Sequence, residues 1–480
     1  MSTPILPGQA APASPTPVAK RRTIEVVWLL GALLVGILGG LSVTASGGRS
    51  VMIVLGILAA IVAVSLIFRD TRNGLYLMLL ALPLDLAGRI ITEPYTLTIY
   101  HVVLVVSLLS WGIRAVREGR DRGIEVSFVH LGVLALVLAA LWSLPFSLDQ
   151  HGTVVGAIRL TFSAAFFALF IRHIRDARTM DRVLVFLVVT SACAAALAVL
   201  QYFVPTLALG ELATVGRGME RVIRPAAFFD DPNYLAGMLS VGIVAALGRA
   251  SYAADLRLAL PWLTGAAVSG VGLLLTLSRT GWVGVAAGLA IVVLAAPVKR
   301  RAWLVIGVAA TLAIVLAASP TVVLERAGSI SDVEGDASVS TRFVMFDSSI
   351  AMFRDNWVHG VGLEAFDDAY PAYRRIGSMR TITKPHQLPL ALPAMMGIAG
   401  LLAELLILAG VVIEVVRHRT TGWDAWLSVA VAGLVALLVQ TLFQYYLYFE
   451  YLWLFLALTV AATRISRSAE EVSHVLTQSG

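Results

Sequence analysis

Long apolar runs alternate with short polar breaks along most of the chain. About 14 of these runs approach the roughly 20 residues that a transmembrane helix needs. They lie near residues 25–44, 50–68, 74–88, 99–115, 127–147, 153–171, 182–204, 233–250, 258–277, 281–298, 302–320, 388–416, 424–445 and 449–465. The third run is short and contains Pro83, so we expect that helix to be broken or re-entrant. The pattern predicts an all-α, polytopic transmembrane bundle of about 12–14 spans.

Composition supports this fold class. Hydrophobic residues make up 58% of the 480 residues and charged residues only 14%. A soluble domain is nearer half apolar and a quarter charged, so the composition favours a membrane protein. The net charge of +6 would suggest nucleic acid in a soluble protein, but basic loops on the cytoplasmic side explain it here, and we expect no nucleic-acid partner. The single cysteine, Cys193, excludes a disulfide framework.

Lysine and arginine concentrate in every second loop, beginning with Lys20, Arg21 and Arg22. The positive-inside rule then places both termini in the cytoplasm and the long loop over 321–387 outside. The predicted divisions are a disordered cytoplasmic tail over 1–22, N-terminal transmembrane helices over 23–204, a core over 205–416 that includes the outer helical loop over 321–387, C-terminal transmembrane helices over 417–466, and a cytoplasmic tail over 467–480.

Arg279 interrupts an apolar stretch that runs from Leu258 to Val298. A charge at the centre of one membrane helix costs about 2.5 to 3.5 kcal/mol on insertion scales, so two helices joined by an outer hairpin are favoured. Gly281 is expected to permit the tight turn. At the hairpin, Arg279 is either an interface anchor or a ligand for an anion. Arg159, inside another span, is open to an ion pair within the bundle or to a ligand role.

The loop before residue 233 carries two further arginines, Arg221 and Arg224. Asp231 and Pro232 then predict a helix start, with an aspartate cap and proline at the first helical position. The N-terminus of that helix would face outward and favour anions. Capping accounts for one of the adjacent Asp230 and Asp231, so no metal site is expected there.

The long outer loop shows helical periodicity and ends at a histidine. Phe343, Phe346, Ile350 and Phe353 predict one face of an amphipathic helix, lying on the membrane surface or capping the bundle. A Gly-Val-Gly segment at 360–362 follows no strand, so it indicates a nucleotide loop only weakly. At the end of the loop, His386 could accept a proton from a hydroxyl. A capping or interface role for His386 is the alternative.

Several of these elements occur in an order that resembles the O-antigen ligase and O-antigen polymerase family of bacterial envelope proteins. The elements are Arg224 ahead of a Phe-Asp-Asp-Pro-Asn turn, Ser278-Arg279-Thr280-Gly281 at a hairpin, Arg342 opening an amphipathic helix, Trp357 with Gly360-Val361-Gly362, and His386 before a long helix with Gly397. The resemblance covers about residues 215–416, which is the predicted ligase-like core. The ordered set is specific, whereas no single motif is.

The resemblance implies a metal-independent glycosyltransferase of the GT-C-like type in the bacterial inner membrane, with no cofactor. It would move a glycan from a polyprenyl (undecaprenyl) pyrophosphate carrier to lipid A–core or to a growing glycan, at the periplasmic face and among membrane lipids. Arg224 and Arg279 would grip the pyrophosphate and His386 would be the catalytic base. We add Arg221 and Arg159 as pyrophosphate candidates. Asn233, Lys384, Gln387 and Arg342 would support the site, and Gln387 stands where the family usually has asparagine.

The alternative from another class is a multi-span secondary transporter or a lipid-linked-glycan flippase. Such proteins often show related halves and charges near the membrane midplane. This sequence has no evident internal repeat, and its unusual charges cluster at the outer ends of helices. A structural assembly partner would leave the arginine and histidine set without a use. The choice between ligase and polymerase stays open.

Overall fold

The computed structural model describes residues 49–91, 96–118, 125–208, 213–215, 222–302, 304–305, 337–374, 385–418 and 424–478. The predicted tail over 1–22, the predicted helix over 25–44 and most of the predicted helix over 302–320 lie outside these ranges. Within them the chain forms helices and two small two-stranded sheets. The predicted all-α class is therefore confirmed.

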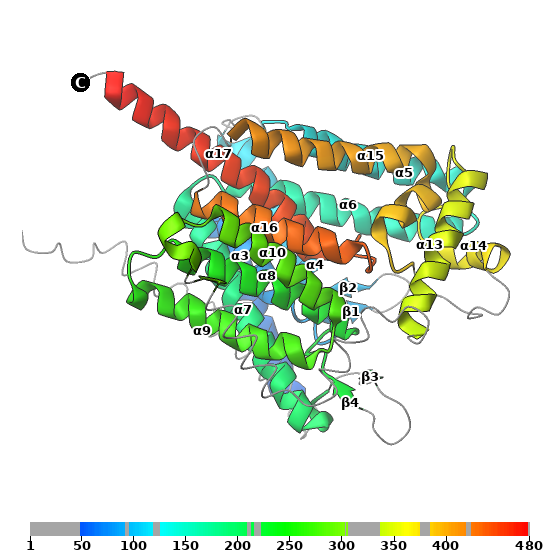
Figure 1. Cartoon of the computed structure of the whole chain (residues 1–480), viewed down its shortest axis with the longest axis horizontal. Coiled ribbons are helices and arrows are strands. Elements are labelled where there is room, and N and C mark those ends of the chain that lie inside the picture. Colours follow the sequence, from blue (N-terminus) through cyan, green and yellow to red (C-terminus); the bar gives the residue numbers. More distant parts are fainter. Residues whose placement is uncertain are drawn as a thin grey trace, which may run out of the picture.

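The helices form a bundle whose members run alongside one another (Figure 1). In chain order the elements are α2 (Arg49–Arg69), α3 (Arg72–Ala81), β1 (Arg89–Ile91), β2 (Leu97–Thr98), α4 (Ile99–Glu118), α5 (Phe128–Ser143), η1 (Leu144–Phe146), α6 (Gln150–His173), α7 (Ala177–Phe203), η2 (Pro205–Leu207), β3 (Ala213–Val215), β4 (Val222–Arg224), α8 (Pro232–Ser251), α9 (Leu256–Leu275), α10 (Arg279–Ala295), α13 (Ala337–Asp355), α14 (Phe366–Tyr373), α15 (Leu388–His418), α16 (Ala425–Thr441) and α17 (Glu450–Gln478). In the described part, seven helices are long and apolar enough to cross a membrane, and three more apolar helices are shorter.

Glycines let neighbouring helices approach closely. A Cβ at Gly132 in α5 would lie 2.7 Å from the Ile407 backbone nitrogen in α15. On the α15 side of the same contact, a Cβ at Gly410 would lie 2.7 Å from the Val129 backbone nitrogen in α5. Small residues at such crossings allow the backbone contact that drives helix association in membranes. Helix α8 is packed by α7, α9, α10 and α16 and is buried along most of its length, so its N-terminus is held firmly.

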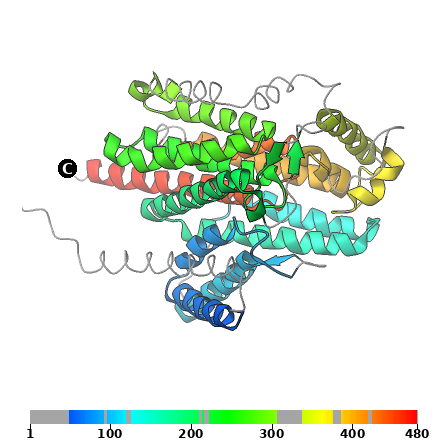
Figure 2. The same ribbon diagram turned by 90° about the horizontal axis from the view of Figure 1, so that it is seen from below.

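The short strands and helices α13 and α14 gather at one end of the bundle, to the right in Figure 1. Strand β3 pairs with β4 in antiparallel fashion, with Ala213 opposite Arg224. The view in Figure 2 shows α2, in blue, at one edge of the bundle, where many of its apolar side chains are exposed. At this edge, α2 contacts α3 and α4.

Helix α13 confirms the predicted helix in the long loop and shows which face it buries. Met345 and Met352 are buried and α13 packs on α15. Of the predicted apolar stripe, Phe343 and Ile350 are 49% and 54% exposed. Phe346 and Phe353 are half-buried. The stripe therefore lies at the border of the buried face, with Phe343 and Ile350 exposed as on a helix at a membrane surface, while the face with Met345 and Met352 packs on α15.

Helix α15 leaves helical geometry at Gly397, where φ is 64°. The turn over 357–362 packs at this break, and the Ile398 nitrogen donates to the Trp357 carbonyl at 2.7 Å. A Cβ at Gly397 would lie 2.6 Å from the Val358 carbonyl carbon, so the approach requires glycine. Non-helical backbone at membrane depth is tolerated where protein buries it, and the turn supplies that cover.

The Gly-Val-Gly segment is part of the same contact. The Val361 nitrogen donates to the Ala394 carbonyl at 3.1 Å, and the Gly362 nitrogen donates to the Met395 carbonyl at 2.9 Å. These bonds occupy backbone groups on both sides. The segment therefore packs its backbone against α15, and it does not form a nucleotide-binding loop.

Candidate functional site

Arg224 ends strand β4 and lies between the ends of two helices. Its Nε donates to the carbonyl of Thr276, the C-cap of α9, at 2.7 Å. Its NH2 group donates to Asn233 Oδ1, in the first turn of α8, at 3.2 Å. The carbonyl end of a helix carries partial negative charge and favours a cation. These bonds fix the guanidinium relative to α8 and α9.

Helix α8 begins as the sequence predicts. The Asp231 side chain accepts a hydrogen bond from the Asn233 nitrogen at 2.7 Å, and Pro232 occupies the first helical position. Asn233 Oδ1 also accepts from the Ser278 hydroxyl at 2.8 Å. Asn233 therefore joins Arg224 to the hairpin between α9 and α10.

That hairpin turns at Leu277, not at Gly281. Leu277 has a φ of 52°, in the left-handed region, and Ser278 caps α10 by accepting from the Gly281 nitrogen at 3.3 Å. The predicted turn role of Gly281 is wrong, because this residue lies inside α10. A Cβ at Gly281 would lie 2.8 Å from the Ala236 Cβ, so glycine is needed where α10 crosses α8.

These segments surround one small pocket, which we call the Arg279 pocket. It is lined by Arg224, Asn233, Leu277, Ser278, Arg279, Thr280 and Arg342. Three arginines and no carboxylate line it, and the N-termini of α8 and α10 both lie there. Arg279 is only 7% exposed. Guanidinium groups fork onto phosphate oxygens and helix N-termini favour anions, so the pocket suits a phosphate-containing ligand.

His386 lies near this pocket, in the short segment before α15, and is half-buried. Burial lowers the pKa of its imidazole below the ordinary value. The charge of Arg342 lowers this pKa further, and Asp231 acts in the opposite direction. The imidazole is therefore neutral near pH 7 and can accept a proton.

Gln387 supports the segment around His386 in a way that the sequence did not predict. Its side chain is 1% exposed, and its Nε2 donates to Ser349 Oγ of α13 at 2.7 Å. The amide thus ties the His386 segment to the helix that also bears Arg342. Its direction is toward α13 rather than toward the Arg279 pocket, whose lining does not include it.

The other predicted site residues fall elsewhere. Arg159 is not part of the lining of the Arg279 pocket. Its guanidinium carbon lies 4.1 Å from the centre of the Tyr448 ring, and the carboxylates of Glu364 and Glu450 attract its charge. Arg221 and Lys384 lie outside the described residues.

One supporting residue was missed in the sequence. The Gln201 amide, near the end of α7, accepts from the Ala227 nitrogen at 2.8 Å and donates to the Ala227 carbonyl at 2.8 Å. Ala227 has a φ of 52°, so this double contact stabilises a strained turn just after Arg224. A lone glutamine at the end of an apolar run is the signal that could have found it.

Among the described residues, no group of three His, Cys, Asp or Glu side chains is arranged to hold a metal ion. The helices and the Arg279 pocket define an integral membrane protein with a basic pocket at one end of its bundle.

Residues 264–405 match the family model described as O-antigen ligase. The match confirms the predicted resemblance to the O-antigen ligase/polymerase family over this segment. No individual curated protein gives a significant match.

Proposed function

We propose that this protein is a metal-independent glycosyltransferase that uses a polyprenyl-pyrophosphate-linked glycan as donor. The match of residues 264–405 to the O-antigen ligase model supports a membrane glycan-handling function. The observation on which the proposal rests is the convergence of three arginines on one small pocket, with a half-buried neutral imidazole nearby. We propose that this end of the bundle faces the periplasm and that both termini lie in the cytoplasm.

The Arg279 pocket would hold the pyrophosphate of the donor. Arg224 and Arg279 supply the positive charge, and the positive ends of the α8 and α10 helix dipoles lie at the same pocket. Negative charge develops on the pyrophosphate as the sugar leaves, so these groups stabilise the transition state more than the bound donor. Asn233 holds Arg224 in place through its Oδ1.

His386 would act as the base. Its neutral imidazole removes the proton from the acceptor hydroxyl while that oxygen attacks the anomeric carbon of the donor sugar. The bond between the anomeric carbon and the pyrophosphate oxygen breaks, and the polyprenyl pyrophosphate leaves with the electron pair. This direct displacement inverts the anomeric configuration. The acceptor would be lipid A–core in a ligase or a growing glycan in a polymerase.

A transfer assay tests this proposal. Purified protein is given undecaprenyl-pyrophosphate glycan and either acceptor in the presence of EDTA. We expect transfer with EDTA, an inverted linkage in the product, and loss of product in His386→Ala and Arg279→Ala. Unchanged transfer in both variants would reject the site. Movement of the donor across vesicles without a new glycosidic bond would instead favour the flippase.

A further inference from the structure

A second pocket rich in arginine lies at the opposite end of the bundle. Two adjoining cavities of about 460 and 350 Å³ share Arg72 and Asp176, and we call them together the Arg114 pocket. Helix α7 begins beside this pocket at Ala177, and near its other end Gln201 holds the loop that follows Arg224. At about 1.5 Å per residue, this helix separates the two pockets by tens of ångströms.

The lining of the Arg114 pocket has a large excess of positive charge. Six arginines line it, and the carboxylates in the lining are those of Asp70 and Asp176. Both carboxylates interact with one arginine, Arg72, at 2.9 Å and 3.9 Å. Five of the six arginines lie near the ends of α3, α4, α6 and α7, and the sixth, Arg175, lies in the segment between α6 and α7. The positive charge is therefore contributed by several helices that meet at the pocket, and not by one of them.

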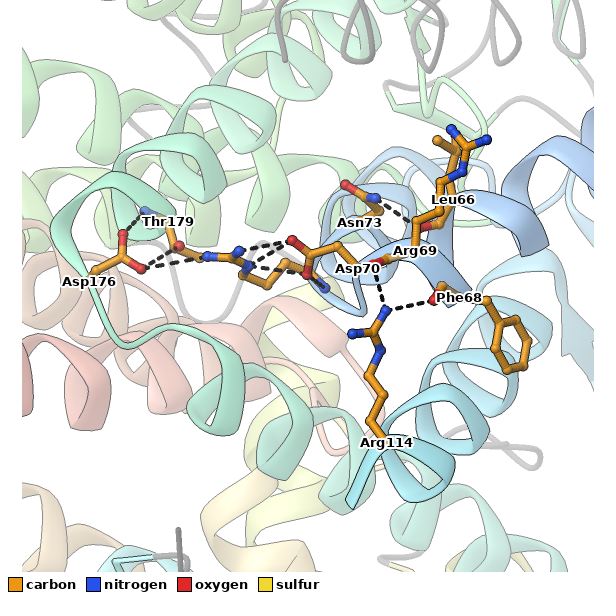
Figure 3. Close-up of polar contacts among 9 residues, drawn as sticks. Leu66, Phe68, Arg69, Asp70, Asn73, Arg114, Asp176 and Thr179 are labelled. Atoms are coloured by element: carbon orange, nitrogen blue, oxygen red, sulfur yellow. Dashed lines mark hydrogen bonds and ion pairs between the residues drawn. The ribbon is translucent and has the colours of Figure 1, made fainter. Parts of the chain in front are cut away.

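Buried donors in this pocket face no acceptor within the described part of the chain. Arg114 donates through NH2 to the Phe68 and Arg69 carbonyls at 2.6 and 2.5 Å, which holds the end of α2. Figure 3 shows this contact beside Asp70, with Asp176 turned toward Thr179. The Nε of Arg114 and the Nε1 of Trp111 are buried and have no hydrogen-bond partner there. An anionic oxygen in the pocket would satisfy such donors.

Exposed apolar side chains lie close in sequence to the residues that form the pocket. Phe68, at the end of α2 that Arg114 holds, is 42% exposed, and Ile113 and Val116, beside Arg114 and Ala115 in α4, are 42% and 85% exposed. In a membrane bundle these side chains face lipid, and Trp111 sits at the same level, as aromatic residues do at the membrane interface. A ligand that combines a phosphate with acyl chains matches both surfaces, whereas a soluble anion matches only the basic one.

We propose that the Arg114 pocket binds the phosphate headgroup of an anionic phospholipid whose acyl chains lie against α2 and α4. Basic pockets between transmembrane helices are suited to such headgroups. The site is separate from the Arg279 pocket and requires no sugar chemistry. Phospholipid binding at this site therefore does not depend on the proposed transferase activity.

Native mass spectrometry of the detergent-purified protein tests the proposal. The probes are phosphatidylglycerol and phosphatidylcholine with identical acyl chains, and inorganic phosphate as a competitor. The variant is Arg175→Ala/Arg178→Ala, which removes two exposed arginines of the lining and leaves Arg114 in place. The control is Arg257→Ala/Lys299→Ala, which removes two exposed cations near the start of α9 and after α10, outside the lining.

We expect wild type and control to retain phosphatidylglycerol preferentially, and the lining variant to lose that preference by about fivefold or more. Inorganic phosphate at equal concentration should not displace the lipid. Equal retention of both lipids by wild type would overturn the proposal, as would an unchanged preference in the lining variant. Displacement by inorganic phosphate would reassign the pocket to a soluble phosphate. A thermal melt of each variant shows whether it is folded.

Discussion

The Arg279 pocket and the Arg114 pocket use the same side chain in opposite ways. The first is small, about 40 Å³, and has three arginines with no carboxylate in its lining. The second consists of two cavities of about 460 and 350 Å³, each of them about ten times larger, and has six arginines together with two carboxylates. A narrow pocket with concentrated charge fits one phosphate-containing group in one pose. A wide pocket with dispersed charge fits a mobile headgroup at a membrane surface.

The partners that hold the arginines explain the contrast. Arg224 is held by a backbone carbonyl and by the Asn233 amide, which fix its position without cancelling its charge. Arg72 is held by the Asp70 carboxylate, and the pair is close to neutral. For the transferase that we propose, preorganised positive charge, rather than the number of arginines, would distinguish the site of chemistry.

The largest effect should come from Arg279. Replacing it with alanine removes a buried charge from the Arg279 pocket, and we expect transfer to fall by about 100- to 1,000-fold. The control is Arg257→Ala, an exposed arginine at the start of α9, which should transfer at the wild-type rate. Initial rates of product formation at fixed donor concentration measure both. Equal losses in the two variants would show that charge in general, not this pocket, matters.

The helices beside the two pockets should also differ in how well they tolerate an added side chain. Gly281→Ala places a Cβ 2.8 Å from that of Ala236, and overpacking of this kind costs about 1 to 3 kcal/mol. Gly112→Ala, next to Trp111 of the Arg114 pocket, meets nothing within 4 Å. We expect a lower melting temperature and slower transfer for the first variant only. Equal melting temperatures for Gly281→Ala and Gly112→Ala would show that α8 and α10 can move apart to accommodate the added Cβ.

A smaller effect should appear in the pH profile. The proposed base, His386, is active when neutral, and the charge of Arg342 helps to keep its pKa low. Arg342→Gln should raise this pKa, so activity should be lost at a higher pH on the acid side. Arg354→Gln, whose side chain is highly exposed on the same helix, should keep the wild-type profile. The dependence of kcat on pH measures the shift, and a shift toward acid would contradict the assignment.

The smallest expected difference is in the response to salt. The Debye length falls from about 10 Å at 0.1 M to about 3 Å at 1 M, and exposed charges are screened more than buried ones. Phospholipid retention at the Arg114 pocket should therefore weaken more than donor binding at the Arg279 pocket. Binding of each ligand measured across this range compares them. Stronger salt dependence of donor binding would reverse the contrast.

Sequence patterns predicted the elements well because apolar periodicity and capping are local. The predicted span over 233–250 is observed as Pro232–Ser251, with the predicted aspartate cap. The third predicted span ends at Ala81, before Pro83, as a broken helix should. Such features depend on neighbours in the chain, and the sequence contains all of them.

Features that depend on contacts between residues far apart in the chain were harder to predict from the sequence. The role of Gly281 depends on Ala236 in another helix, and the break at Gly397 depends on the turn around Val358. The order of motifs pointed to Arg224, Arg279 and Arg342, which line one pocket. It could not foresee that Arg159 packs over Tyr448, because only the folded bundle brings α6 beside that ring.

The central claim is that the Arg279 pocket binds the donor while His386 performs the chemistry. Donor affinity without acceptor, and turnover with acceptor, are measured for wild type, Arg279→Ala and His386→Ala. We predict that His386→Ala keeps the wild-type donor affinity but loses turnover by about 100-fold or more, whereas Arg279→Ala loses donor affinity by about tenfold or more. Normal turnover in His386→Ala, or unchanged donor affinity in Arg279→Ala, would contradict the account.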